Sequence, residues 1–355
     1  MPDEKTAGDL NVLSEDPLCA GVFLPDIHVP VSPTQGHFIR SHFPAPQIDT
    51  ADWSLSVSGD VDNPLSLSYD DLLKMPSREV ICVMECAGNS RSTMQPPAEG
   101  VQWDNGAVSV ARWKGVSLKT VLDQASLKGI ATDVLFEGED SGRVPQAGTE
   151  MSYAMSLPLA KTLDLDTILA YEMNGEPIPR DHGFPIRLLI PGWYGMASVK
   201  WLSKIAVMDH PNGGFHELDY RIYPATDGKS DAEATRVSRL KVKSLISTPV
   251  RGSVVEPGTH TVKGVAWSGD GHITKVEVST DDGRSWRKAD LEGPSGDYSW
   301  QRWKIEWNAT SLGHSLLRCR ATDSSGNVQP MLADWNYRGY QVNSVHSVPI
   351  TVRTG

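Results

Sequence analysis

A cysteine and an arginine that closely follow an apolar run are the first residues in this sequence that could do chemistry. In "EVICVMECAGNSRS", the run Val80–Met84 is short, apolar and β-branched at its start, which predicts a buried strand covered on both faces. Gly88 and Asn89 turn the chain, so Cys86 lies at the carboxyl end of the strand, where open sheets often bind ligands. A thiolate held among positive charges has a lowered pKa, which suits either a nucleophile or a soft-metal ligand. The alternative is a buried structural thiol, a common environment for a free cysteine.

Further candidate side chains occur beside apolar or proline-bent segments. Arg187 and Lys200 lie within strand-like text, "PIRLLI" and "SVKWL", where a cation is costly unless an anion meets it. Several buried cations predict a phosphate or another oxyanion as their partner. Taken singly, each residue has a simpler interpretation, because arginines are usually solvated or paired and a lone histidine usually only hydrogen-bonds. The other candidates are Arg40, His42, Arg91, Trp103 and His182.

The common catalytic and metal-binding motifs are absent from the sequence. It contains no G-x-G-x-x-G after a strand, G-x-x-x-x-G-K-[ST], G-x-S-x-G or H-E-x-x-H pattern, and no Cys/His zinc spacing. Four cysteines, Cys19, Cys82, Cys86 and Cys319, are too few and too scattered for a disulfide scaffold. On one strand, Cys82 and Cys86 would lie about 13 Å apart, so at most one of them binds a given metal centre.

Composition limits the class of protein and its partners. A chain of 355 residues, 39% hydrophobic and 22% charged, can bury a large core and is long enough for two domains. The net charge of -11 argues against nucleic acid or an anionic membrane as the partner. No run approaches the roughly 18 apolar residues of a membrane span, and the acidic start lacks the pattern of a signal peptide. We expect a cytoplasmic chain, or a periplasmic one whose export signal has already been removed.

The pattern of predicted secondary structure changes once along the chain. Up to about residue 225 strands such as "WSLSVSG" mix with helices such as "SYDDLLKM", where Ser68 and Asp71 form a capping pattern, and "SLKTVLDQA". Asn174-Gly175 predicts a tight hairpin turn. We therefore predict an α+β domain, residues 1–240, whose last part, from about 225, is a polar connection.

The second domain, residues 241–355, reads as all-β. The segments "HTVKGVAWSG", "ITKVEVSTDDGRSW", "WQRWKIEWNAT" and "SLLRCRATDSSGN" alternate apolar and polar residues between turn clusters. Short strands at this spacing predict an immunoglobulin-like β-sandwich of about a hundred residues.

Several long motifs in one order carry a family resemblance. "ECAGNSR", "GVQWDNGAVSVARWKGVSL" and "LAYEMNGEPIPRDHGFPIRLLIPGWYGMASVKWLSKI" closely resemble the sulfite oxidase family of molybdopterin enzymes. The match extends from "FIRSHFPAP" to "DWNYRGY", which is most of the chain. It implies a mixed α/β molybdopterin-binding domain of the sulfite oxidase fold, followed by a β-sandwich domain that forms a homodimer.

The resemblance also implies a molybdenum cofactor, with the metal bound by one pyranopterin dithiolene, oxo groups and a single cysteine thiolate. Cys86 matches that ligand, which suits a soft, high-valent metal held at a rigid strand end. The phosphate expected above would then be that of the pterin. The matched pterin-binding positions are Phe38, Arg40, His42, Asp140, His182, Arg187, Ser198, Val199 and Lys200.

The activity implied is the oxidation of sulfite to sulfate. The sulfur lone pair would attack an oxo group of the metal, arginines would hold the anion, and Tyr220 would hydrogen-bond near the oxo group. Two electrons would then pass to an external acceptor. The matched substrate-pocket positions, expected to be catalytic, are Arg40, Arg91, Trp103, Tyr220 and Arg338.

Two departures from the family pattern affect this interpretation. Family members often read CAGNRR, whereas Ser90 stands here in place of the first arginine, so one local charge is missing. No haem-binding module flanks the matched domains, so we expect no haem and direct transfer to a cytochrome c or to oxygen.

Three alternatives compete with sulfite oxidation. Assimilatory nitrate reductases share the cysteine motif, but that family lacks an arginine at the place of Arg338. Sulfoxide reductases of the wider superfamily typically lack the C-terminal β domain. A partner-binding protein with a decayed catalytic half is disfavoured by the intact Cys86, Arg91 and Lys200.

Overall fold

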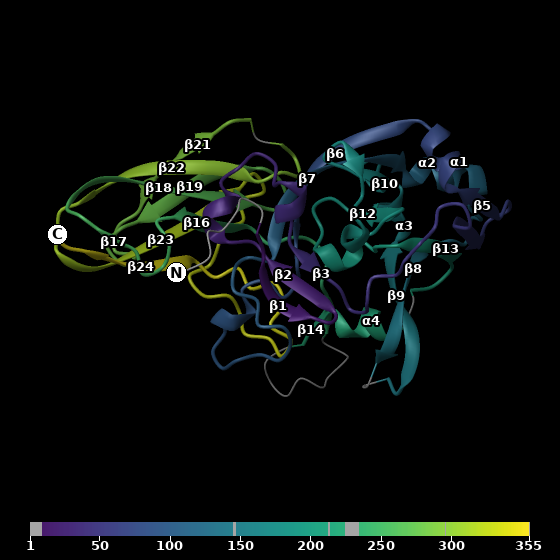
Figure 1. Cartoon of the computed structure of the whole chain (residues 1–355), viewed down its shortest axis with the longest axis horizontal. Helices are drawn as coiled ribbons and strands as arrows, with labels where there is room; N and C mark the ends of the chain where they lie inside the picture. Colours follow the sequence, from purple (N-terminus) through teal and green to yellow (C-terminus); the bar gives the residue numbers. More distant parts are fainter. Residues whose placement is uncertain (1–8, 145–146, 212–213, 224–233, 295, 355) are drawn as a thin grey trace.

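The computed structural model describes residues 9–144, 147–211, 214–223, 234–294 and 296–354. Two parts lie side by side along the long axis of the molecule, a β-sandwich formed by the C-terminal residues and a mixed part formed by the preceding ones (Figure 1). Within the described residues, no helix combines the length and apolar character needed to cross a membrane.

The strand that precedes Cys86 lies at one edge of a five-stranded sheet. Its strands follow the order β11-β10-β7-β6, with β12 also paired to β10. The strand β6 is buried from Cys82 to Glu85, which confirms the prediction of a covered strand. The turn at Asn174-Gly175 joins β10 to β11 with positive φ at both residues, as the hairpin prediction requires. The bounds are β6 (Ser77–Glu85), β7 (Val108–Ser117), β10 (Ile168–Met173), β11 (Glu176–Pro177) and β12 (Arg187–Leu189).

A second five-stranded sheet completes the frame of the mixed part. Its order is β5-β4-β13-β8-β9, in which β4 and β13 run parallel and the other pairs antiparallel. The paired strands β8 and β9 form a long hairpin that projects from the body of the molecule (Figure 1). Its members are β4 (Ser54–Gly59), β5 (Leu65–Ser68), β8 (Asp133–Val144), β9 (Thr149–Pro158) and β13 (Leu202–Met208).

Helices are short and few in this part of the protein. The predicted capping box is present, since Asp71 N–H donates to Ser68 Oγ at 3.2 Å and Ser68 N–H donates to Asp71 Oδ2 at 3.0 Å. The mixed part is therefore mostly β, with less helix than the α+β prediction suggests. The α-helices are α1 (Tyr69–Lys74), α2 (Leu118–Ala125), α3 (Leu159–Thr162) and α4 (Phe215–Asp219). The 3-10 turns are η1 (Leu24–Ile27), η2 (Thr34–Gly36), η3 (Arg91–Thr93), η4 (Arg180–His182) and η5 (Gly195–Ala197).

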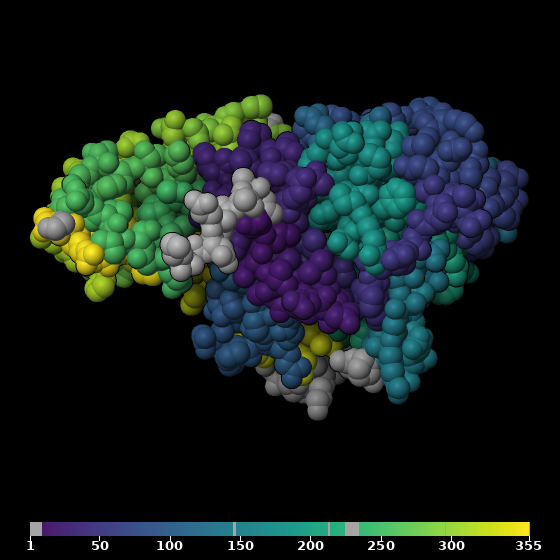
Figure 2. Space-filling view, viewed as in Figure 1, coloured from purple at the N-terminus to yellow at the C-terminus, as the bar shows by residue number. Residues whose placement is uncertain are grey.

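The N-terminal segment crosses the junction between the two parts, as Figure 2 shows by its purple colour. Its strands β1 (Asn11–Glu15), β2 (Leu18–Gly21) and β3 (Ile39–Arg40) form a small sheet. The indole of Trp300 donates to Val29 O at 2.7 Å, which ties this segment to the sandwich. Much of the polar connection expected at 225–240 lies outside the described residues. Beside it, β14 (Arg221–Ile222) pairs with β15 (Thr235–Arg236).

The C-terminal part consists of two sheets around one apolar core. The sheets have the orders β16-β18-β22-β21 and β17-β24-β23-β19-β20, and each of the four quoted β segments contains a strand. The first strand begins at Lys243; the domain boundary at residues 240 and 241 stays a prediction. The bounds are β16 (Lys243–Thr248), β17 (Val254–Val255), β18 (Gly258–Trp267), β19 (Ile273–Ser279), β20 (Arg287–Lys288), β21 (Asp290–Glu292), β22 (Gln301–Ala309), β23 (Gly313–Asp323) and β24 (His346–Val352).

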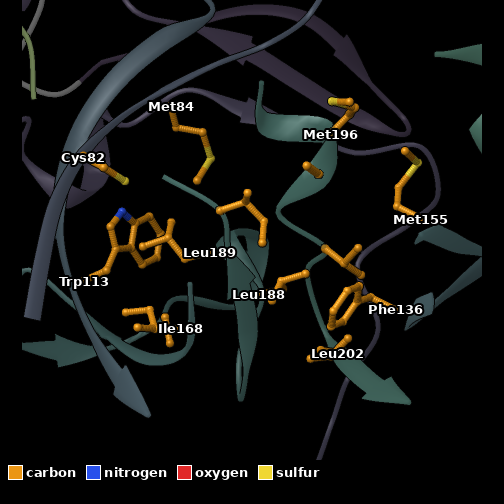
Figure 3. Close-up of a cluster of buried hydrophobic side chains, with 14 of the residues drawn as sticks. Cys82, Met84, Trp113, Phe136, Met155, Ile168, Leu188, Leu189, Met196 and Leu202 are labelled. Atoms are coloured by element: carbon orange, nitrogen blue, oxygen red, sulfur yellow. The ribbon is translucent and has the colours of Figure 1, made fainter. Parts of the chain in front are cut away.

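The larger hydrophobic core lies between the sheets of the mixed part. Figure 3 shows Met84 and Met196 above Leu188, Leu189 and Trp113 in this cluster. Side chains of the sandwich, among them Trp267 and Tyr340, belong to the same cluster. The two parts therefore share a core, and groups at their junction are held firmly.

Candidate active site

Cys86 lies where β6 ends and where two cavities meet. Its N–H donates to Ala107 O at 2.9 Å, and its carbonyl accepts from Asn89 N–H at 2.9 Å. These bonds fix the residue on both sides of the turn. Four residues contribute to the lining of both cavities: Arg40, His42, Cys86 and Tyr220.

The inner cavity, of about 60 Å³, collects most of the residues predicted to bind a pterin. Val199 is the exception, because it is buried and does not line the cavity. Met84 and Met196 join the inner cavity to the core shown in Figure 3. The predicted residues that line it are Phe38, Arg40, His42, Asp140, His182, Arg187, Ser198 and Lys200.

Buried polar atoms in the inner cavity lack partners. Arg187 is 6% exposed, and its Nε and Asp140 Oδ1 are buried without hydrogen-bond partners in the described structure. Burial lowers the pKa of Arg187 to about 10 and that of the Lys200 ammonium, and it raises the pKa of Asp140. Within the described part of the chain, Lys200 Nζ donates to Ser41 Oγ at 2.7 Å and to Asp181 O at 2.9 Å and to no carboxylate. An anionic group with further polar atoms would satisfy these side chains.

The two predicted histidines are held neutral. Burial keeps the pKa of His182 and that of His42 well below the usual value, and neighbouring cations act in the same direction. His42 Nε2 and Tyr220 Oη share a hydrogen bond of 2.8 Å. Burial also raises the pKa of Tyr220 well above its usual value, so its phenol stays protonated. This pair is a neutral hydrogen-bonded unit beside Cys86.

The outer cavity, of about 310 Å³, is lined by every residue predicted for the substrate pocket. Four guanidinium groups line it, three of them from the predicted residues and one from Arg143, and the buried indole Nε1 of Trp103 has no hydrogen-bond partner among the residues described. Such a donor set suits an oxyanion. The predicted residues are Arg40, Arg91, Trp103, Tyr220 and Arg338.

Arg91 is 6% exposed, and its side chain packs directly against the backbone of glycines. Its Nε donates to Arg338 O at 2.9 Å and its Nη1 to Val101 O at 2.8 Å. A Cβ at Gly88 would lie 2.5 Å from Arg91 Nη2, and one at Gly339, where φ is +58°, would lie 2.8 Å from Arg91 Cγ. The chain therefore needs glycine at these positions to admit the arginine.

Arg338 comes from the C-terminal part and reaches the same cavity. Its Nη2 forms an ion pair with Asp219 Oδ1 at 2.8 Å. Tyr340, two residues further on, stacks on Tyr220 with ring centroids 5.2 Å apart and lies under the guanidinium of Arg91. The active site thus depends on both parts of the molecule.

The expectation of a lowered pKa at Cys86 is wrong for the protein without metal. Burial raises the pKa of this thiol and outweighs the opposing effect of Arg40 and Arg91. A thiolate here needs a positive partner beyond these arginines, which a metal ion provides. Cys82 is buried in the core, and its pKa is raised to about 12, as for a structural thiol.

Several lining residues were not identified from the sequence, among them Tyr153, His216, Arg143 and Tyr340. Tyr153 lines the inner cavity and donates to Met196 O at 2.8 Å, while His216 lines the outer cavity and packs on Tyr153. Arg143 and Tyr340 also line the outer cavity. Only Tyr340 carried a signal, since it lies in the motif "DWNYRGY".

The donor set fits the molybdenum cofactor implied by the resemblance. Arg187 and Lys200 have no carboxylate partner in an ion pair within the described chain, so a pterin phosphate would satisfy them. Within the same residues no group of three His, Cys, Asp or Glu side chains could hold a metal ion, which agrees with one thiolate ligand from the chain. Cys86 is a free cysteine and lines both cavities, so it can provide this thiolate.

Comparison with known proteins identifies the family. The family model of the oxidoreductase molybdopterin-binding domain matches residues 42–216, and that of the Mo-co oxidoreductase dimerisation domain matches residues 234–353. The sulfite oxidase of Gallus gallus is 38% identical over 338 residues, which are 89% of this chain and 72% of that protein. The mitochondrial sulfite oxidase of Mus musculus is 38% identical over 341 residues, 91% of this chain.

Coverage differs between these relatives. This chain spans 62% of the length of the mouse protein. Among solved structures, the sulfane dehydrogenase SoxCD from Paracoccus pantotrophus matches with a TM-score of 0.82 at 27% identity, covering 96% of this chain and 88% of that one. Fold, site and sequence agree: the chain belongs to the sulfite oxidase family of molybdopterin-binding oxidoreductases.

Proposed function

We propose that this protein oxidises sulfite to sulfate and passes the electrons to an external acceptor. The observation that carries the proposal is the meeting of two cavities at Cys86. The inner one is lined by cations without a carboxylate partner in the described chain, which suits a pterin phosphate, and the outer one is lined by four arginines. Sulfite and water give sulfate, two protons and two electrons. The molybdenum cofactor, when bound, supplies the transferable oxygen and accepts the electron pair.

The side chains of the outer cavity bind and orient the substrate. Arg40, Arg91 and Arg338 neutralise the dianion from different elements of the fold, which fixes its orientation relative to Cys86. Trp103 Nε1, buried without a partner in the described structure, offers one further donor to a substrate oxygen. The burial of these donors strengthens their interaction with the anion.

Tyr220 acts as a neutral donor beside the sulfur ligand when the Nε2–H tautomer of His42 donates to its Oη, which leaves the phenol proton for a substrate oxygen. The bond of 2.8 Å to His42 fixes the direction of its hydroxyl, and its stacking on Tyr340 fixes the ring. Because burial raises the pKa of the phenol, Tyr220 keeps its proton at neutral pH and does not repel the anion.

The proposed cofactor residues divide by chemistry. Arg187 and Lys200 bind the pterin phosphate. Asp140, His42 and His182 form hydrogen bonds with the other polar atoms of the pterin. Phe38 and Ser198 line the same cavity, whereas Val199 does not line it and its carbonyl accepts from Leu188 N–H at 2.9 Å, so a role of Val199 in cofactor binding stays a prediction.

Assays on the molybdenum-loaded protein test the proposal. We expect sulfite-dependent reduction of cytochrome c or ferricyanide, with two electrons transferred for each sulfate formed. Comparison with oxygen as the acceptor identifies the preferred one. No turnover with any acceptor, in protein that contains molybdenum, would refute the proposal. Nitrate reduction driven by reduced viologen dye is the rival activity, and turnover faster than with sulfite would favour it.

The assembly we propose is a homodimer formed through the C-terminal part. Support comes from the match of residues 234–353 to a Mo-co oxidoreductase dimerisation domain. Light scattering should give twice the chain mass of 38.8 kDa. A monomer at micromolar concentration would contradict the proposed assembly.

A further inference from the structure

A buried ion pair lies directly behind the turn that carries Cys86 and Arg91. Lys243 Nζ, from the first strand of the sandwich, donates to Glu85 Oε1 at 2.8 Å, and each side chain is 1% exposed. Glu85 is the residue before Cys86 on β6. A charge pair this deeply buried is costly to form and is retained only when its geometry is well satisfied.

Every charge in this pair has additional partners. Glu85 Oε1 also accepts from Asn89 Nδ2 at 2.9 Å, and Glu85 Oε2 accepts from Trp267 Nε1 at 2.9 Å. Asn89 Oδ1 in turn accepts from Ala107 N–H at 3.1 Å. Ala107 is the residue whose carbonyl holds the Cys86 N–H. The ion pair is therefore bonded to both sides of the Cys86 turn.

The lysine also holds Ser90, the residue before Arg91. Lys243 Nζ donates to Ser90 Oγ at 2.8 Å, and Ser90 Oγ donates to Asn105 Oδ1 at 2.6 Å. Ser90 has φ of 71°, a left-handed conformation that is unfavourable for a residue with a Cβ. The surrounding bonds must stabilise this conformation, which directs Arg91 into the outer cavity.

We propose that Lys243 is a positioning residue, which reaches from the C-terminal part and holds the Cys86–Arg91 turn. Through its hydrogen bond to Ser90, its ammonium also supplies a positive charge at this position of the turn. Lys243 does not line either active-site cavity, so it acts on the reaction only through this turn. The position of Ser90 explains why an arginine is absent there, since a second cation would face the Lys243 ammonium in a buried site. The kinetic part of this inference rests on the proposed oxidation of sulfite.

The primary test uses hydrogen exchange of the holoprotein, measured by mass spectrometry. In Lys243→Met, we expect backbone amides of residues 86–91 to exchange at least about tenfold faster, since Asn89 and Arg91 N–H donate to the carbonyls of Cys86 and Gly88 within the turn itself. Lys241→Met is the matched control, because Lys241 is an exposed lysine two residues away that should leave the turn unchanged. Glu85→Gln with Lys243→Met removes both charges, so it folds more readily and still loses the bond to Ser90.

Steady-state kinetics separate positioning from general stability. We expect KM for sulfite to rise about tenfold in Lys243→Met with kcat within about twofold, because Arg91 is misdirected. Ser90→Ala should raise KM as well, and its effect should largely vanish in the Lys243→Met background.

Faster exchange across both parts with unchanged KM would show a merely structural lysine and overturn the inference. Unchanged exchange at residues 86–91 in both the single and the double variant would also overturn it. Absence of sulfite turnover in the wild type would refute only the proposed function, since the exchange result does not depend on substrate.

Discussion

At the scale of single residues, the site depends on groups whose burial makes them incomplete. Cys86 has a raised pKa, and Arg187 Nε and Trp103 Nε1 have no partner in the described chain. Each is an energetic cost in the protein alone, because buried polar groups are normally satisfied. These unsatisfied groups indicate two ligands. One is an anionic cofactor that carries a metal, and the other is a small oxyanion.

The thiol assignment predicts a selective loss. Cys86→Ser replaces sulfur by a harder and less acidic oxygen, so we expect molybdenum content and sulfite turnover to fall at least about tenfold. The melting temperature, compared between cofactor-free proteins, should change by less than about 3 °C, because the substitution nearly conserves volume. Elemental analysis and calorimetry measure both quantities. Cys82→Ala, in the core, is the control that should keep its metal; wild-type metal content in Cys86→Ser would refute the assignment.

A second substitution at this scale concerns the ion pair in the outer cavity. Arg338→Gln removes a cation and leaves the Asp219 carboxylate facing the substrate, so KM for sulfite should rise about 10- to 100-fold. Molybdenum content should stay at the wild-type level. Asp219→Asn added to Arg338→Gln should recover part of the affinity. Equal KM in the single and wild-type proteins would mean that Arg338 does not contact the anion.

At the scale of elements, local patterns predicted well and long-range contacts did not. The buried strand before Cys86, the Ser68 capping box and the Asn174-Gly175 hairpin depend on neighbours in sequence, and all are present. The partners of Glu85 and the contribution of Tyr153 depend on residues far away in the chain, where a single sequence carries no pairing signal. The pKa of Cys86 was mispredicted for the same reason, because burial is a property of the assembled elements.

The turn between β6 and η3 gives a prediction at this scale. In Gly88→Ala the new Cβ would lie 2.5 Å from Arg91 Nη2, the far end of a side chain and not backbone, so the guanidinium should move while the fold persists. We expect KM for sulfite to rise about tenfold and the melting temperature to fall by less than about 4 °C. Gly129→Ala, which meets no atom within 4 Å, is the control. A large drop in stability with unchanged KM would contradict this account.

At the scale of the whole molecule, the two parts form one unit around the site. Arg338 and Tyr340 complete the outer cavity, and Lys243 supports the Cys86 turn from behind. Tryptophans of the sandwich belong to the larger core, and the N-terminal segment covers the junction (Figure 2). Separate alternation patterns correctly suggested a mixed part and a β part, but nothing in them indicated that the parts share one core.

Histidines held neutral in both parts predict how the stability of the whole molecule varies with pH. Burial, with Lys243 and Arg251 nearby, lowers the pKa of His346 from 6.5 to about 3, and His346 Nδ1 accepts from Ile246 N–H at 3.0 Å. Between these two values the unfolded chain binds a proton that the folded chain does not, so folding stability falls as pH drops below about 6.5. Because His346 is only half-buried, solvent screening weakens this effect, and from pH 7.5 to 5 the residue should cost at most about 2 kcal/mol. His346→Asn keeps an acceptor for Ile246 but cannot titrate, so denaturant unfolding at both pH values should show a loss smaller by about that amount. An identical slope in His346→Asn would mean that His346 is not held neutral by the fold.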